Sequence, residues 1–346
     1  MKHGLLGRSG YLALALAAAL VGCGSKEQGA APAPVTVRLG YFANVTHAPA
    51  IVGLEQGWFA AELGPNAKLE PKTFNAGPEA VEALFSEALD LTYVGPNPAI
   101  NAFAKSEGKA IRIVAGATSG GAALVVQPSI TKPADLAGKK LATPQLGNTQ
   151  DVALRAWLKG QGLSANLEGG GDVSIVPQAN AQTLETFRSG EIQGAWVPEP
   201  WATRLVLEGG GVVLVDERSL WPDGKFVTTH LVVRTKFLAE HPDLVAAVLR
   251  AHVRAVDFAN AEPAKARELV NAGIAKVTGK ALPAAVIEGA WDKLAFTVDP
   301  IASSLRKSAD DAMAAGLLEP VKLDGIYDLA PLNAVLAAAG KPQVSP

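Results

Sequence analysis

Short apolar segments alternate with amphipathic ones through the first third of the chain. In the amphipathic segments the apolar residues recur at helical spacing, whereas the apolar runs are short enough for strands. We predict strands over 35–41, 69–74, 91–94 and 111–115, and helices over 49–61, 78–88 and 99–104. This alternation predicts a parallel sheet that helices cover on both faces.

The alternation continues to about residue 234, and from Lys236 the pattern is helical to the end. We predict further strands over 122–127, 141–143, 173–176, 194–197, 212–215 and 228–234. Helices are predicted from 148 or 149 onward and over 182–188, 241–258, 263–277, 283–294, 301–315 and 329–339. With 35 Gly and 23 Pro marking the turns, the fold class is α/β, and we expect the helical tail to pack back on the first part of the chain.

The N-terminus has the pattern of a targeting segment. Lys2 and Arg8 precede an apolar run over 11–21, which is too short to span a bilayer. The run ends in Leu20-Val21-Gly22-Cys23, which resembles the bacterial lipobox. We therefore expect a signal peptide over 1–22, lipidation of Cys23 and a flexible linker over 23–34. The alternative is a plain secretory signal with an incidental cysteine.

Composition and charge exclude several classes of protein. At 346 residues and 49% hydrophobic residues the chain suits two lobes, and its formal charge of -2 gives no reason to expect nucleic acid. Cys23 is the only cysteine, and the five His are scattered, so we expect no disulfide, no metal site and no cofactor. The motifs of serine hydrolases, phosphate-binding loops and zinc proteases are also missing from the sequence.

Polar side chains follow three of the predicted strands. Asn44 and His47 come after the first, Asn97 after the third, and Thr118 and Ser119 after the fourth. Ligands in open α/β sheets lie beyond the carboxyl ends of the strands, so these side chains are expected to converge on one rim. Ordinary turn chemistry is the alternative for each, because Asn, Ser and Thr are common in loops.

A fourth candidate lies where the strand over 141–143 leads into a helix. Gly147, Asn148, Thr149 and Gln150 stand at the start of that helix, where unpaired N–H groups hold anions without a charged side chain. Ordinary helix capping is the alternative, and Asp151 would suit a capping pair with Asn148 while repelling an anion.

Four segments together carry a family resemblance. They are Gly40-Tyr41-Phe42 with Asn44-Val45-Thr46-His47-Ala48-Pro49, then 90–98, 138–149 and 194–201. The chain resembles the solute-binding proteins of bacterial ABC importers, in the branch that binds aliphatic sulfonates, taurine, nitrate, bicarbonate and thiamine pyrimidine. The resemblance implies a two-lobed periplasmic-binding-protein fold of type II, in which each lobe is a mixed, mostly parallel sheet flanked by helices.

The resemblance also implies two hinge crossings, which we expect near 119–123 and 226–231. Lobe 1 would then comprise 35–120 plus 231–346, and lobe 2 would comprise 121–230. The family's cleft positions add Trp196, Glu199, Thr229 and His230 to the nine residues named above. Trp196 would cover the organic part of a solute, Glu199 would hold an ammonium if it faces the cleft, and His230 would add a donor if protonated. The alternatives are a core tryptophan, an exposed residue at a helix start and a neutral core histidine.

We expect a solute-binding lipoprotein that captures a small anionic or zwitterionic solute, first of all an aliphatic sulfonate, and delivers it to the permease and ATPase of an importer. Taurine, nitrate, bicarbonate and thiamine pyrimidine are alternatives within the family, and an enzyme on the same fold or a sensory lipoprotein are alternatives of other classes. The expected protein is an extracytoplasmic monomer held to the membrane by its lipid, and it is not an enzyme.

Overall fold

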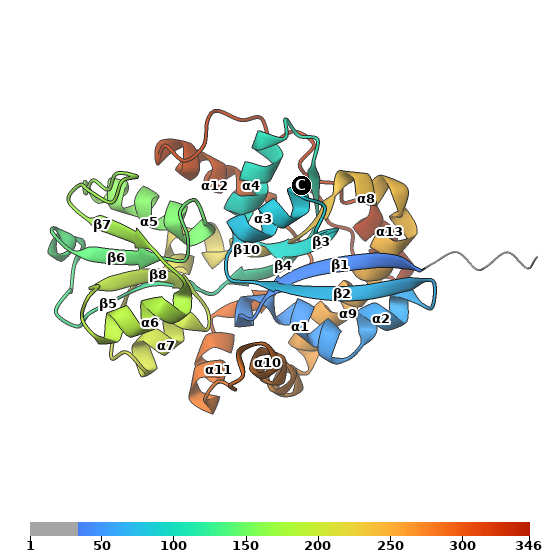
Figure 1. The fold of residues 1–346 in the computed structure, drawn as a ribbon, viewed down its shortest axis with the longest axis horizontal. Coiled ribbons are helices and arrows are strands. Elements are labelled where there is room, and N and C mark those ends of the chain that lie inside the picture. Colours follow the sequence, from blue (N-terminus) through green and yellow to red (C-terminus); the bar gives the residue numbers. More distant parts are fainter. Residues whose placement is uncertain (1–33) are drawn as a thin grey trace, which may run out of the picture. The chain divides into compact units, whose positions relative to one another are not determined.

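The computed structural model describes residues 34–346 (Figure 1). The expected signal peptide, Cys23 and all of the expected linker except Pro34 lie outside these residues. By their contacts, residues 34–346 form one unit, which contains two sheets.

The first sheet has six strands in the order β11-β4-β10-β3-β1-β2. Four of them run in one direction, and β10 and β11 run in the other. The six strands are β1 (Val35–Phe42), β2 (Ala67–Phe74), β3 (Leu91–Val94), β4 (Ile111–Gly120), β10 (Val227–Arg234) and β11 (Leu294–Phe296).

The second sheet has five strands in the order β7-β6-β8-β5-β9, and only β5 runs against the other four. Both sheets are therefore mixed, with most strands in one direction, as the resemblance implies. The five strands are β5 (Ala122–Val126), β6 (Lys140–Thr143), β7 (Ser174–Pro177), β8 (Gly194–Pro198) and β9 (Val212–Asp216).

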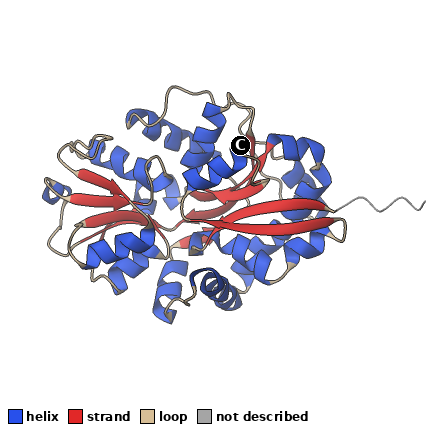
Figure 2. Ribbon diagram, viewed as in Figure 1, coloured by secondary structure: helices blue, strands red, loops and turns tan. Residues whose placement is uncertain are grey.

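Helices cover both faces of each sheet (Figure 2). On one face of the six-stranded sheet pack α1 (Ala48–Glu55), α2 (Trp58–Leu63), α9 (Pro242–Ala261), α10 (Pro263–Thr278), α11 (Ala284–Trp291) and α13 (Ala330–Ala338). On its other face pack α3 (Gly77–Phe85), α4 (Pro96–Lys105) and α12 (Ala302–Ala314). The five-stranded sheet packs on α5 (Thr149–Gly160) from one side and on α6 (Asn180–Arg188) and α7 (Trp201–Leu207) from the other. The remaining helical segments are α8 (Thr235–Glu240), η1 (Val45–His47), η2 (Pro133–Leu136), η3 (Glu217–Leu220) and η4 (Pro222–Gly224).

The chain passes between the two sheets at two points. At the first, only Gly121 separates β4 from β5. Gly120 and Gly121 have φ of +78° and +75°, and a Cβ at Gly121 would lie 2.0 Å from a side-chain carbon of Leu294, so glycine is required there. At the second, the chain returns after Phe226 and β10 enters the six-stranded sheet between β3 and β4. The predicted lobe boundaries, with lobe 2 over 121–230, stay a prediction. Val227 to His230, at the end of that range, pair with strands of the six-stranded sheet.

Three predicted elements differ from the structure. The strand predicted to end at Ala115 continues to Gly120, so Thr118 and Ser119 lie inside β4 rather than in a loop. The helix predicted over 49–61 is divided into α1 and α2 by Gly57, whose φ of +67° is left-handed. The tail is not entirely helical, because β11 pairs with the end of β4.

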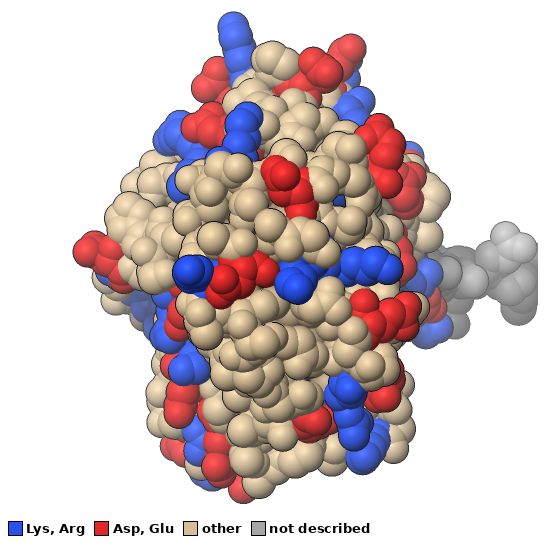
Figure 3. All heavy atoms as spheres, turned by 90° about the vertical axis from the view of Figure 1, so that its left-hand side faces the viewer, with Lys and Arg blue, Asp and Glu red and all other residues tan. Residues whose placement is uncertain are grey.

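Two surface properties bear on the class of protein. On the face shown in Figure 3, Lys and Arg side chains are interspersed with Asp and Glu, and neither sign forms a continuous field. Within residues 34–346, no helix has both the length and the apolar composition needed to cross a membrane.

Candidate ligand-binding site

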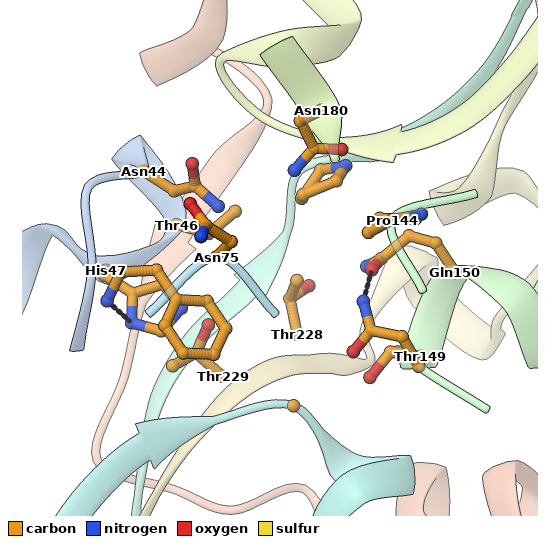
Figure 4. A pocket seen from close by; sticks show the side chains of 14 residues that line it. Asn44, Thr46, His47, Asn75, Pro144, Thr149, Gln150, Asn180, Thr228 and Thr229 are labelled. Carbon is orange, nitrogen blue, oxygen red and sulfur yellow. Dashed lines mark hydrogen bonds between the residues drawn. The ribbon is translucent and has the colours of Figure 1, made fainter. Parts of the chain in front are cut away.

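A small cavity lies between the two sheets (Figure 4), and we call it the closed cavity because residues on the side of each sheet form its walls. Its volume is about 20 Å³ when counted as space open to the centre of a water molecule, so it has room for a compact chemical group. None of its lining residues is Asp, Glu, Lys or Arg. They are Phe42, Asn44, Thr46, His47, Asn75, Gly95, Thr228 and Thr229 from the six-stranded side, and Pro144, Asn148, Thr149, Gln150, Asn180 and Pro198 from the five-stranded side.

The start of α5 lines this cavity through Asn148, Thr149 and Gln150. Asn148 is the N-cap residue, but its side chain does not cap the helix and instead donates to Oε1 of Gln150 (3.1 Å). In the described part of the chain, the N–H groups of Thr149 and Gln150 have no hydrogen-bond acceptor. They belong to the first turn, where a helix leaves its donors unpaired and carries a partial positive charge.

Three buried polar atoms at the cavity also lack a partner within residues 34–346. They are the hydroxyl oxygens of Thr149 and Thr229 and the amide oxygen of Asn180. Thr149 and Asn180 belong to helices that pack on the five-stranded sheet, and Thr229 belongs to β10. A buried polar group without a partner costs about 1–3 kcal/mol, so a ligand or water that pairs with these atoms would offset that cost.

His47 is a neutral donor rather than a cation. Burial lowers its pKa to about 3, and its ring stacks on Phe42 with the centroids 4.3 Å apart. The Phe42 N–H donates to Nδ1 of His47 (3.3 Å), which assigns the remaining proton to Nε2. His47 can therefore donate one hydrogen bond without adding a charge.

Asp151 does not face the cavity as a free charge, which corrects the expected conflict with an anion. Its side chain is fully buried and accepts hydrogen bonds from the Thr143 hydroxyl (2.9 Å) and the Gly147 N–H (2.9 Å). Arg155 contacts the same carboxylate at 3.1 Å and balances its charge. Asp151 thus fixes the loop before α5, and the expected capping pair with Asn148 is wrong. Gly147 belongs to this support and does not line the cavity.

Three more of the predicted residues connect elements of the scaffold. The Asn97 amide donates to a carbonyl oxygen in α12 (3.0 Å), and the Thr118 hydroxyl donates to the carbonyl of Thr46 (2.7 Å). The Ser119 hydroxyl accepts from the N–H of Phe226 (3.3 Å) where the chain returns between the sheets. None of the three side chains lines the cavity.

Trp196 lies in the core of the five-stranded sheet. It is fully buried, packs edge-on against Trp157 and donates from Nε1 to the Glu217 carboxylate (2.7 Å). The structure therefore does not bring Trp196 to the cavity.

Glu199 and His230 also point elsewhere. The Glu199 carboxylate accepts from the N–H and the hydroxyl of Thr203, each at 3.0 Å, and lines a different cavity. His230 is fully buried with Nε2 3.2 Å from the carbonyl of Pro300, and burial lowers its pKa to about 4. Burial therefore disfavours the protonated form of His230, and the residue does not line the cavity.

The cavity has eight lining residues that the sequence analysis did not propose. Two of them could have been found by the rule applied to the other loops, because Asn75 directly follows β2 and Asn180 begins α6 after β7. The eight are Phe42, Thr46, Asn75, Gly95, Pro144, Asn180, Pro198 and Thr228.

A second space of about 310 Å³ adjoins this cavity and shares Asn44, Asn75 and Asn180 with it. Trp201 of α7 lines the larger space, and its Nε1 donates to the amide oxygen of Asn44 (3.0 Å), which links the two sheets. The other lining residues are Ala43, Thr73, Phe74, Ala179, Ala181, Val277 and Thr278.

In residues 34–346, no group of three or more His, Cys, Asp or Glu could hold a metal ion.

Comparisons with known proteins bear on the family and the fold. The chain is 31% identical to the taurine-binding periplasmic protein of Escherichia coli (strain K12) over 208 residues, which are 60% of this chain and 62% of that protein. The match thus spans about three fifths of that relative's length.

Two solved structures have a similar fold. The alkanesulfonate-binding protein SsuA from Xanthomonas axonopodis pv. citri, bound to MOPS, aligns with a TM-score of 0.69 at 22% identity, over 84% of this chain and 96% of that chain. The periplasmic nitrate-binding protein NrtA from Synechocystis PCC 6803 aligns with a TM-score of 0.75 at 16% identity, over 89% of this chain and 90% of that chain. The predicted periplasmic-binding-protein fold is therefore confirmed.

A family profile described as the NMT1-like family matches residues 30–275, which is more than half of the chain. This match shows that the chain belongs to the NMT1-like family.

Proposed function

We propose that this protein captures a small organic sulfonate between two lobes and delivers it to the membrane subunits of an ABC importer. The sulfonate group would occupy the closed cavity at the start of α5. Its organic part would extend into the adjoining space beside Trp201.

The observation that carries this proposal is the set of unpaired donors around an uncharged cavity. The N–H groups of Thr149 and Gln150 and the hydroxyls of Thr149 and Thr229 approach from both sheets. Three oxygens of a sulfonate would accept from such donors, and hydrogen bonds to a charged group are stronger than neutral ones. Neutral His47 would add a further donor from Nε2.

The lining favours a simple alkanesulfonate over taurine. Taurine also carries an ammonium group, and no carboxylate lines either the closed cavity or the adjoining space. Taurine remains the second candidate because of the similarity to a taurine-binding protein, and the amide oxygen of Asn180 is free to accept from an ammonium. Nitrate and bicarbonate would fill the closed cavity alone, without using the adjoining space.

Delivery follows from hinge closure at the two chain crossings. Lobe 1 would comprise 35–120 plus 231–346 and lobe 2 would comprise 121–230, and the importer would recognise the closed form. The protein would act outside the cytoplasm as a monomer held to the membrane through lipidated Cys23, and it would bind its solute without converting it.

Binding is tested by thermal unfolding and titration calorimetry with ethanesulfonate, taurine, nitrate, bicarbonate and thiamine pyrimidine. A solute that binds only the folded state stabilises it by RT ln(1+[L]/Kd), about 2.7 kcal/mol at 100 times Kd. We expect ethanesulfonate to give the largest shift in melting temperature.

Ethyl methyl sulfone is the matched control, because it has a similar shape but no charge. We expect it to cause no shift. The proposal is wrong if none of the anions stabilises the protein, or if the sulfone does so equally. Chemical conversion of a bound solute would show an enzyme instead.

A further inference from the structure

A third cavity, of about 590 Å³, lies on a different part of the boundary between the two sheets. It shares no residue with the closed cavity or with the space beside Trp201. One wall comes from β5, α7 and β9 of the five-stranded sheet, and the other comes from α11 and the segment that follows it. We call it the Glu199 cavity. Its lining residues are Ala122, Ala123, Glu199, Ala202, Thr203, Val206, Leu207, Val213, Asp216, Ala285, Glu288, Gly289, Asp292 and Lys293.

Most of this lining is apolar, and part of the apolar surface is exposed. Alanine, valine and leucine side chains form the walls, and Leu207 and Val213 at the edge are 54% and 49% exposed. Cavities of several hundred Å³ with apolar walls and a few fixed polar groups are the usual form of small-molecule sites. The walls therefore suit an occupant with a compact apolar body.

One buried carboxyl group gives the cavity a polar anchor. Glu199 is only 3% exposed, and both of its hydrogen bonds come from Thr203. A carboxylate can accept about four hydrogen bonds, so two positions remain for a donor in the cavity. Burial raises the pKa of Glu199 to about 7, and a cation beside it would favour the charged form.

The remaining charges around the Glu199 cavity are mainly negative. Asp216, Glu288 and Asp292 line it together with a single cation, Lys293. Asp216 is already paired with Arg218 at 2.6 Å, whereas Glu288 and Asp292 have no ion-pair partner in the described part of the chain. The charge of the lining thus favours a positively charged donor over an anion.

We propose that the Glu199 cavity is a second ligand site, for an organic ammonium with a compact apolar body. The ammonium donates to Glu199, and the apolar body lies between α7 and α11. Glu199 therefore holds an ammonium away from the sulfonate site, rather than within it.

Benzylammonium is the probe, and benzyl alcohol is its uncharged control. Binding of each to the purified protein is measured by ligand-observed NMR and by titration calorimetry at pH 7.5. We expect benzylammonium to bind at least tenfold more tightly than benzyl alcohol. Glu199→Gln keeps an acceptor for Thr203 but removes the charge, and it should abolish this preference. Glu191→Gln changes an exposed glutamate in the same way and should have no effect.

A second variant tests the location without changing the buried carboxyl. Ala285 is exposed on α11 and lines the Glu199 cavity, so Ala285→Trp should fill the cavity, leave the fold intact and block both probes. The proposal is overturned if benzylammonium does not bind, if its binding survives both Glu199→Gln and Ala285→Trp, or if ethanesulfonate competes with it.

Discussion

At the scale of single residues, the closed cavity is distinguished by polar atoms that the fold leaves unpaired. The hydroxyls of Thr149 and Thr229 are buried without a partner within residues 34–346. Such groups lower the stability of the empty protein, and a bound anion would restore the missing hydrogen bonds. The residues that matter most for binding should therefore be ones whose removal does not harm the fold.

Thr149→Val replaces the unpaired hydroxyl by a methyl group of similar size. We expect ethanesulfonate affinity to fall by about 10- to 100-fold, because hydrogen bonds to charged groups contribute about 1.5–3 kcal/mol. The free energy of unfolding of the empty protein should stay the same or rise. Calorimetry and urea denaturation measure the two effects. Thr235→Val is the matched control, since Thr235 also has an unpaired buried hydroxyl but lies outside the cavity. Equal affinity in the two variants would contradict this prediction.

Asp151 differs from Thr149 and Thr229, because we expect its removal to destabilise the fold. Asp151→Asn would leave Arg155 buried without its counter-charge, and breaking such a pair costs about 3–5 kcal/mol. We expect a loss of that size in urea denaturation, whereas Asp310→Asn on the exposed face of α12 should change little. A loss below about 1 kcal/mol would mean that Asp151 does not support the loop.

At the scale of elements, the starts of α4 and α5 approach each other across the boundary between the sheets. Gly95, the residue before α4, makes this approach possible, because a Cβ there would lie 2.2 Å from the Thr149 hydroxyl. α5 in turn is positioned by the loop that Asp151 holds. Gly95 and Thr149 both line the cavity, so part of its wall comes from two helix starts that meet there.

Gly95→Ala should prevent the closest approach of α4 and α5. We expect ethanesulfonate to bind at least tenfold more weakly, with the unfolding of the empty protein little changed, because a small separation of the two helix starts relieves the contact. Gly160→Ala, at the end of α5, provides the control, since its Cβ would meet nothing within 4 Å. Normal binding by Gly95→Ala in calorimetry would show that this close contact is not needed.

The pattern of apolar residues was enough to predict most elements and the fold, because strand and helix spacing are local properties. It was not enough for β11, a three-residue strand whose pairing with β4 depends on a segment about 175 residues away. The same holds for the end of β4, where Thr118 and Ser119 resemble a loop in sequence but pair with β10 and β11. Tertiary pairing decided these cases.

For the cavity, the sequence indicated residues that follow strands or begin helices, such as Asn44, His47 and Thr149, whereas Thr229 came from the family resemblance. It could not show the direction of side chains on a buried strand. Trp196 points into the core between α5 and the five-stranded sheet, and His230 points toward Pro300. Successive side chains of a strand lie on opposite faces of the sheet. When both faces are buried, the strand is apolar throughout, and its sequence does not show which side chains lie on which face.

At the scale of the whole molecule, buried carboxyl groups lie where the two sheets meet. Glu217, after β9, is 2% exposed and accepts a hydrogen bond from Trp196. The charges of Lys307 and Asp311 act on it from α12, which packs on the six-stranded sheet. Burial raises the pKa of Glu217 from 4.5 to about 7. We therefore expect the contact between the sheets to depend on pH.

The sign of this effect follows from the raised pKa. The contribution of Glu217 to stability is complete below pH 4.5 and is lost as the pH rises through about 7, because the folded state then loses a proton that it holds more tightly. Glu217→Gln keeps an acceptor for Trp196 and never ionises. We expect its stability relative to the natural protein to rise between pH 5 and pH 8, by up to about 3 kcal/mol.

Thermal and urea unfolding at several pH values would measure this difference. Glu191→Gln, at an exposed position, should show a constant difference over the same range. A pH-independent difference for Glu217→Gln would mean that Glu217 is charged throughout.

The position of β10 has a consequence for the order in which the chain folds during synthesis. In the six-stranded sheet, β10 lies between β3 and β4 and separates them. It is synthesised more than 100 residues after β4. Residues 34–120 therefore cannot complete the six-stranded sheet on their own, and the chain must be synthesised beyond Arg234 before the central strand can be inserted.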